Sequence, residues 1–227
     1  MHFVLAFLAT IGFVTIKAGS MSKESARQLC EEMAFRYGSE TQANLELAMD
    51  AARTIAHAFA GIKQAGNLPD RQTMDLILMQ VLEQNPEFVG VWSCWEPNAL
   101  DGKDQEFINA KGSDSSGRYV PYWNSGGGKI NVEPLVDYET QGAGDYYLLA
   151  LKSGKEQILE PYMYPIGGKD VLITSVVVPI IVDNKVLGVL IMTSHQFQKQ
   201  NLLILVCLFK LVKHLPLGVS QYLFPKK

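Results

Sequence analysis

The sequence lacks the short motifs that support most enzyme chemistry. It contains no GxSxG, no phosphate-binding loop and no Rossmann glycine pattern. Residues 126–129, GGGK, lack the spacing of a phosphate-binding loop and a following serine or threonine, so they predict a turn. None of the four histidines has a carboxylate or a second histidine at metal-ligand spacing. We therefore expect no catalytic residue, no metal and no cofactor.

Cysteine and positive charge are also scarce. Cys30, Cys94 and Cys207 lie far apart and form no CxxC pair, which excludes a disulfide scaffold and gives no support for a zinc site or a redox pair. The formal net charge of -3 does not suggest a nucleic-acid partner, which normally needs a concentrated basic face. With 48% hydrophobic and 19% charged residues among 227, the composition predicts a folded chain with one sizeable core.

Near the N-terminus, residues 3–16 form an uncharged run, FVLAFLATIGFVTI, which ends at Lys17. A full membrane span needs roughly 20 apolar residues, so the run is short for one. It could be a signal-peptide core of about 7–15 residues, a span shortened at its N-terminal side, or a buried core helix. No basic region precedes it and no A-x-A cleavage site follows. We therefore favour an uncleaved membrane anchor over residues 1–19.

Two helices are predicted next. Residues 20–66 carry apolar side chains at three- and four-residue steps, with Ser20 or Ser22 as the N-cap. A helix of that length far exceeds the globular mean of about 11–12 residues, and it suits a helix that leaves a membrane or packs along a domain. A second helix should run from the N-cap Asp70 to Gln84 and end before Asn85-Pro86.

From Phe88 onward the apolar period changes from helical spacing to two. Turns at 167–170 and 183–184 predict two hairpins, and therefore an antiparallel sheet. The fold class is α+β, with a long N-terminal helix packed on a PAS-like antiparallel sheet formed by residues 67–192. The atypical tail, 193–227, is too short and too charged in its apolar part for a second span. We expect a short helix over 145–151 and strands at 88–95, 107–110, 118–124, 158–164, 171–182 and 186–192.

The order of these elements over residues 26–190 resembles the Cache family, whose members are PAS-like sensor modules of bacterial chemoreceptors and histidine kinases. The resemblance is carried by residues 88–98 (FVGVWSCWEPN), 117–138 (GRYVPYWNSGGGKINVEPLVDY) and above all 160–190 (EPYMYPIGGKDVLITSVVVPIIVDNKVLGVL). It implies an extracytoplasmic sensor on the inner membrane, a small-molecule ligand and a homodimer through the long helix. The departure after Leu190 suggests a truncated or frame-shifted receptor. The alternatives are a histidine kinase or cyclase sensor and a non-signalling fragment.

Aromatic side chains gather on the predicted strands and suit a small polar ligand, such as an amino acid, an amine or a carboxylate. Strand alternation places Tyr162 and Tyr164 on one face. Arg118 could bind a carboxylate, and a surface arginine is its rival interpretation. The resemblance implies pocket positions for Tyr146, Tyr147 and Tyr162, whereas the family's amine-binding aspartates are replaced by Tyr164 and Thr193. Asp137, Asp145 and Asp170 could substitute, although each also fits a turn. The candidate ligand-binding residues are Trp95, Arg118, Tyr122, Trp123, Tyr146, Tyr147, Tyr162, Tyr164 and Asp170.

Overall fold

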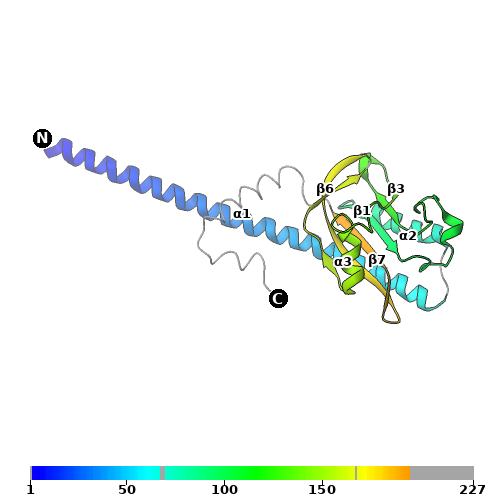
Figure 1. Ribbon diagram of the computed structural model, residues 1–227. Coiled ribbons are helices and arrows are strands. Elements are labelled where there is room, and N and C mark those ends of the chain that lie inside the picture. Colours follow the sequence, from blue (N-terminus) through cyan, green and yellow to red (C-terminus); the bar gives the residue numbers. More distant parts are fainter. Residues whose placement is uncertain (1, 67–69, 167, 195–227) are drawn as a thin grey trace. The chain divides into compact units, whose positions relative to one another are not determined.

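The computed structural model describes residues 2–66, 70–166 and 168–194 (Figure 1). The predicted tail therefore lies outside the described residues from position 195 onward. The chain divides into two units, and the described residues are 2–42 in the first and 43–194 in the second, apart from the gaps just named. Among these residues, no helix combines the length and the apolar character that a bilayer crossing requires.

The first helix, α1, runs from His2 to Gln64. The predicted start at Ser20 or Ser22 is wrong, because nothing in the preceding apolar run breaks a helix. The Ser20 hydroxyl donates to the Lys17 carbonyl at 2.9 Å, as an interior helical serine does. The second helix, α2 (Arg71–Gln84), begins as predicted, and the Asp70 side chain accepts a hydrogen bond from the Thr73 amide at 2.7 Å.

The second unit contains an antiparallel sheet in the order β3-β2-β1-β7-β6-β4, with β5 paired to β6. The β6–β7 hairpin turns at Asp183-Asn184, where both residues have positive φ, as a two-residue hairpin turn requires. The strands are β1 (Phe88–Trp95), β2 (Pro121–Asn124), β3 (Asn131–Pro134), β4 (Gln157–Ile158), β5 (Tyr162–Ile166), β6 (Lys169–Val182) and β7 (Lys185–Ser194). The remaining elements are α3 (Asp145–Ser153) and the 3-10 helices η1 (Asp104–Phe107) and η2 (Gly126–Gly128).

Two strand predictions need correction, and one strand was not predicted. The strand expected at 107–110 is wrong, because Phe107 ends η1 and packs under the Arg71 guanidinium, 4.1 Å from the ring centroid. The strand expected at 158–164 is two strands, β4 and β5, which pair with different parts of β6. The third strand, β3, was not predicted, because only Val132 among its four residues is buried.

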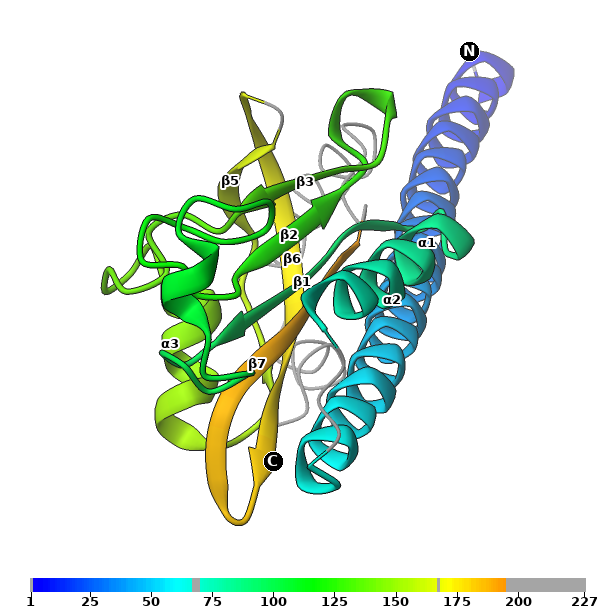
Figure 2. The same ribbon diagram turned by 90° about the vertical axis from the view of Figure 1, so that its right-hand side faces the viewer.

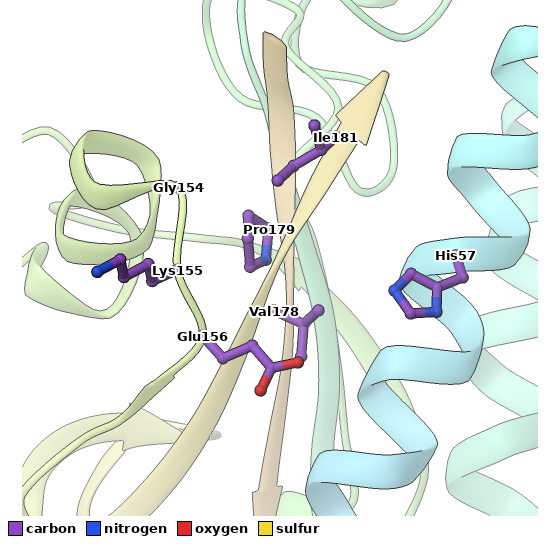
Figure 3. Close-up of a pocket in the computed structure, with 7 residues that line it drawn as sticks. All are labelled: His57, Gly154, Lys155, Glu156, Val178, Pro179 and Ile181. Atoms are coloured by element: carbon purple, nitrogen blue, oxygen red, sulfur yellow. The ribbon is translucent and has the colours of Figure 1, made fainter. Parts of the chain in front are cut away.

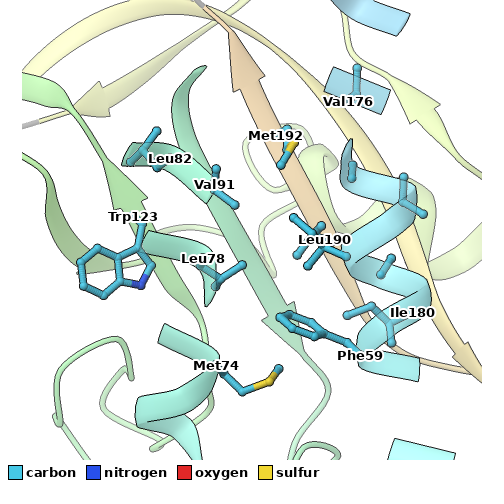
Figure 4. Close-up of a cluster of buried hydrophobic side chains, with 14 of the residues drawn as sticks. Phe59, Met74, Leu78, Leu82, Val91, Trp123, Val176, Ile180, Leu190 and Met192 are labelled. Atoms are coloured by element: carbon cyan, nitrogen blue, oxygen red, sulfur yellow. The ribbon is translucent and has the colours of Figure 1, made fainter. Parts of the chain in front are cut away.

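The two faces of the sheet carry different elements. Figure 2 shows α1 and α2 on one face and α3 on the other. On the helix face, Phe59 of α1 and Met74 and Leu78 of α2 pack against Val91 and Leu190 of the sheet (Figure 4). The opposite face forms a second core, in which α3 covers an aromatic set of side chains. These faces separate the predicted site residues into two groups.

Candidate functional site

An aromatic cluster lies on the α3 face of the sheet. It is centred on Trp92, whose ring centroid lies 4.7 Å from that of Tyr122, 4.9 Å from Tyr146 and 5.1 Å from Tyr164. Tyr162 completes the cluster, with its ring nearly parallel to that of Tyr146 at a centroid distance of 6.4 Å. Trp92 is fully buried and belongs to the core. Because Tyr162 and Tyr164 alternate on β5, both face this cluster.

A cavity of about 410 Å³ opens beside the aromatic cluster, between the segment 136–145, α3 and β5. Tyr146, Tyr162 and Tyr164 line its wall. Its lining also contains three carboxylates and no lysine, arginine or histidine. The carboxylates are Asp137, Asp145 and Glu160. The lining thus combines aromatic residues with negative charge, and both favour a cation.

Two tyrosines of the cavity wall also hold its rim. The Tyr146 hydroxyl donates to the Val136 carbonyl, and the Val136 amide donates to the Tyr164 hydroxyl at 3.4 Å. Burial raises the pKa of Tyr164 to about 12 and raises that of Tyr146 further. Both hydroxyls therefore stay protonated at neutral pH and keep their bonds to the Val136 backbone.

Arg118 is buried, so its interpretation as a surface arginine is wrong. Its Nε donates to the Trp95 carbonyl at 3.0 Å, Nη1 pairs with Glu139 at 2.5 Å, and Nη2 donates to the Tyr147 hydroxyl at 3.0 Å. Tyr147 in turn donates to Glu96. The guanidinium thus joins the end of β1, the rim segment (residues 136–145) and α3. It does not line the cavity.

Three other candidate residues lie away from the cavity. Trp95 and Trp123 are on the helix face, because they alternate with Cys94 and Tyr122 on their strands. The Trp123 indole donates to Asp75 of α2 at 3.1 Å. Asp170 lies in β6 instead of the predicted turn, pairs with Pro165 and is exposed. Of the nine predicted residues, the structure brings Tyr146, Tyr162 and Tyr164 to the cavity, with Tyr122 packed behind Tyr164.

Glu160 lines the cavity and was not predicted from the sequence, although it directly precedes the Pro-Tyr pair at the start of β5. Asp137 and Asp145 line the cavity as well as serving their turns. Asp137 has φ 55°, and the Asp145 side chain accepts from the Gly142 amide at 3.0 Å. β6 carries two adjacent polar residues, Thr174 and Ser175. Ser175 is the one that faces the cluster, because its hydroxyl meets that of Tyr162 at 3.0 Å.

A second cavity, of about 450 Å³, lies between α1, the segment that follows α3 and β6 (Figure 3). His57 of α1 faces Val178 and Glu156 across it, while the Lys155 amine points away. Glu156 also pairs with Arg53 of α1 at 2.6 Å, so an ion pair joins α1 to the segment that follows α3. Within the described part of the chain, no three histidine, cysteine, aspartate or glutamate residues are grouped to hold a metal ion.

A long helix on one face of an antiparallel sheet, with a short helix and a cavity on the other, is the architecture of a PAS-like sensor module. Residues 74–194 match the family described as the first PDC sensor domain of methyl-accepting chemotaxis protein-like proteins. The chain belongs to this family, which confirms the family and the fold class predicted from the sequence.

Known relatives agree with this assignment. The chain is 32% identical over 132 residues to the methyl-accepting chemotaxis protein TlpQ of Pseudomonas aeruginosa, an alignment that covers 53% of this chain and 18% of that receptor. Among solved structures, it is similar to the extracellular domain of the putative histidine kinase mmHK1S-Z2, with 35% identity and a TM-score of 0.63 over 72% of this chain and 58% of that chain. Methyl-accepting chemotaxis protein X is similar at 29% identity and a TM-score of 0.62, over 73% and 60% of the two chains.

Proposed function

We propose that the chain is the ligand-sensing part of a chemoreceptor and that its cavity binds a small organic cation, such as a primary amine. One observation carries the ligand class: three tyrosine rings and three carboxylates line the cavity, and no basic side chain does. A cation over a tyrosine face gains about 0.5–1 kcal/mol at an exposed site and about 2 when desolvated. A carboxylate ligand would meet only like charge at the rim.

The state of Arg118 argues against a carboxylate ligand. A guanidinium recognises a carboxylate through two parallel N–H donors. In this chain, Nη1 of Arg118 is paired with Glu139, and Nη2 donates to Tyr147 and lies 3.5 Å from Glu96. Binding a ligand carboxylate there would break these bonds. We infer that Arg118 holds the rim segment and α3 in place, and that it is a positioning residue.

A route from the cavity to α1 exists within the second unit. Tyr146 of the cavity wall lies on α3, and the segment after α3 carries Glu156, which pairs with Arg53 of α1. A ligand that favours one position of α3 would therefore favour one packing of this segment against α1. We propose that α1 carries the signal, that residues 1–19 anchor the chain in the inner membrane, and that the sensor dimerises through α1.

A histidine kinase sensor is the second candidate. It is favoured by the similarity to mmHK1S-Z2 and to a second putative histidine kinase, mmHK1S-Z3, whose extracellular domain is 34% identical with a TM-score of 0.65. The ligand proposal is the same for both candidates, because it rests on the cavity. The two differ in the output domain, and the gene that encodes the full receptor identifies which output is attached.

Thermal unfolding of the full chain against amines, amino acids and carboxylates tests the ligand class. A ligand present at 100 times its dissociation constant adds about 2.7 kcal/mol to the free energy of unfolding, which moves the midpoint by several degrees. We expect shifts with amines and none with simple carboxylates. Shifts with carboxylates alone would contradict the proposal. Arg118→Lys, assayed against the same panel, should lower the midpoint without changing the order of the ligands.

A further inference from the structure

A row of polar residues crosses the α3 face of the sheet behind the cavity wall. Asn124 of β2 is paired with Gly90 of β1, Gly90 with Thr193 of β7, and Thr193 with Ser175 of β6. Residues paired directly across strands point to the same face, so these four positions form one line, which we call the polar row. The three side chains of the row, those of Asn124, Thr193 and Ser175, are polar and almost fully buried. The neighbouring row on the same face contains the apolar residues Trp92 and Ile191.

One half of the polar row is internally satisfied. The Ser175 and Thr193 hydroxyls meet at 2.9 Å, and the Trp92 indole donates to Thr193 at 3.0 Å. The Tyr162 hydroxyl meets Ser175 at 3.0 Å. Because Tyr162 also lines the cavity, this hydrogen-bond chain begins at the cavity wall and ends in the interior of the sheet.

The other half has two polar groups without a hydrogen-bond partner among the described residues. They are the Tyr122 hydroxyl and the Asn124 amide nitrogen, and both side chains are 1% exposed. The Asn124 oxygen accepts from the Gly126 amide at 3.1 Å, which identifies the free atom as the nitrogen. Buried polar groups nearly always have partners, so two free ones side by side on one strand need an explanation.

Both residues that carry a free group lie beside Gly90. The Tyr122 hydroxyl lies 3.2 Å from the place where a Cβ of Gly90 would stand, and Asn124 is the residue paired with Gly90. The Tyr164 ring packs edge-on against Tyr122 at 5.4 Å and also lines the cavity. The contact between the cavity wall and Tyr122 is thus made through the Tyr164 ring. That ring is tethered at its hydroxyl by a long bond of 3.4 Å.

We propose that this end of the polar row is an inner subsite, in which the Tyr122 hydroxyl and the Asn124 amide donate to an uncharged acceptor oxygen or nitrogen of the ligand. The inference rests on the proposed function and narrows its ligand class. The ligand is an organic cation that carries an acceptor group, with the cation among the rim carboxylates and the acceptor behind Tyr164. The Tyr164 ring moves aside to admit it.

Calorimetric titration of the full chain with isosteric amine pairs tests the subsite. The pairs are ethanolamine with propylamine, glycinamide with isobutylamine, and β-alaninamide with isoamylamine, where only the first member of each pair carries an acceptor. The wild-type chain should bind the acceptor-bearing member about tenfold more tightly in at least the longest pair, because its analogue leaves two buried donors unpaired. Tyr122→Phe should reduce that preference, because only the Asn124 donor remains. It should not lower the thermal midpoint, since the hydroxyl has no partner to lose among the described residues.

Tyr119→Phe is the matched control. Its hydroxyl donates to Asp75 at 2.9 Å on the helix face, so the variant should lower the midpoint and keep the tenfold preference. Asn124→Asp provides a second test of the same preference. The aspartate keeps an oxygen that accepts from the Gly126 amide, and it removes both N–H donors of the Asn124 side chain. Equal binding of both members to the wild-type chain, unchanged in Tyr122→Phe, would overturn the subsite and leave the proposed function standing. If neither member of any pair binds, the proposed function and the subsite both fail.

Discussion

The Tyr122 ring occupies the space that a side chain at position 90 would need. Its Cε2 atom lies 2.5 Å from the place where a Cβ of Gly90 would stand. Glycine weakens a strand, so its presence in a central strand often marks a close approach of another group. Here the approaching group is the Tyr122 ring of the aromatic cluster, and the glycine allows that ring to lie close against β1.

This relationship predicts a large effect of adding one methyl group. Gly90→Ala should lower the free energy of unfolding by about 1–3 kcal/mol, because overpacking moves the Tyr122 ring. Chemical denaturation measures the change. Gly61→Ala is the matched control, since Gly61 lies in α1 with no atom within 4 Å of an added Cβ, and it should gain about 0.5–1 kcal/mol. Similar effects of the two substitutions would show that the ring does not fill this space.

Asp75 of α2 is a half-buried carboxylate on the helix face, where Tyr119 and Trp123 donate to it at 2.9 and 3.1 Å. Burial raises its pKa above the ordinary 3.8, although hydrogen bonds from Trp123 and Tyr119 and the charges of Lys111 and Arg71 lower it. A raised pKa in the folded state means that stability falls as the pH rises through the window between the unfolded and folded values.

Asp75→Asn removes that titration. The free energy of unfolding of the variant, relative to that of the wild-type chain, should therefore increase as the pH rises from about 3 to about 7. Urea denaturation at several pH values gives this difference directly. If this difference in the free energy of unfolding decreased with rising pH instead, the fold would stabilise the charged form of Asp75.

The Arg53–Glu156 ion pair should contribute little to stability, because both side chains are about 40% exposed. Glu156→Gln should cost less than about 1 kcal/mol at neutral pH, and high salt should reduce the cost. A hydrogen bond from Arg53 lowers the pKa of Glu156, so the cost should disappear as the pH falls from 4.5 through the lowered value. Thermal unfolding with Glu87→Gln as an exposed control checks both dependences, and a salt-independent loss would contradict this description.

Local signals explain which elements could be predicted from the sequence. Asp70 begins α2 and Asp183-Asn184 turns the last hairpin, and each acts within a few residues. The strand expected near Phe107 failed because a distant residue, Arg71, packs on that ring. No pattern within residues 104–110 reports a guanidinium supplied by another helix.

The candidate site divides in the same way. Tyr162 and Tyr164 could be assigned to one face from alternation alone. The role of Arg118 could not be assigned, because its partners Glu139 and Tyr147 are 21 and 29 positions away. The polar row could not be predicted from the sequence either. The pairing of Asn124 with Gly90, and of Gly90 with Thr193, depends on the register of three strands.

The central claim, a cavity that prefers cations, is tested most directly by calorimetric titration of the full chain with propylamine and with propionate. The two ligands have the same carbon chain and opposite charges. We expect propylamine alone to bind, about two- to fivefold more weakly in Glu160→Gln and unchanged in Glu106→Gln, because one exposed charge pair is worth about 0.2–1 kcal/mol. Binding of propionate but not of propylamine would contradict the account.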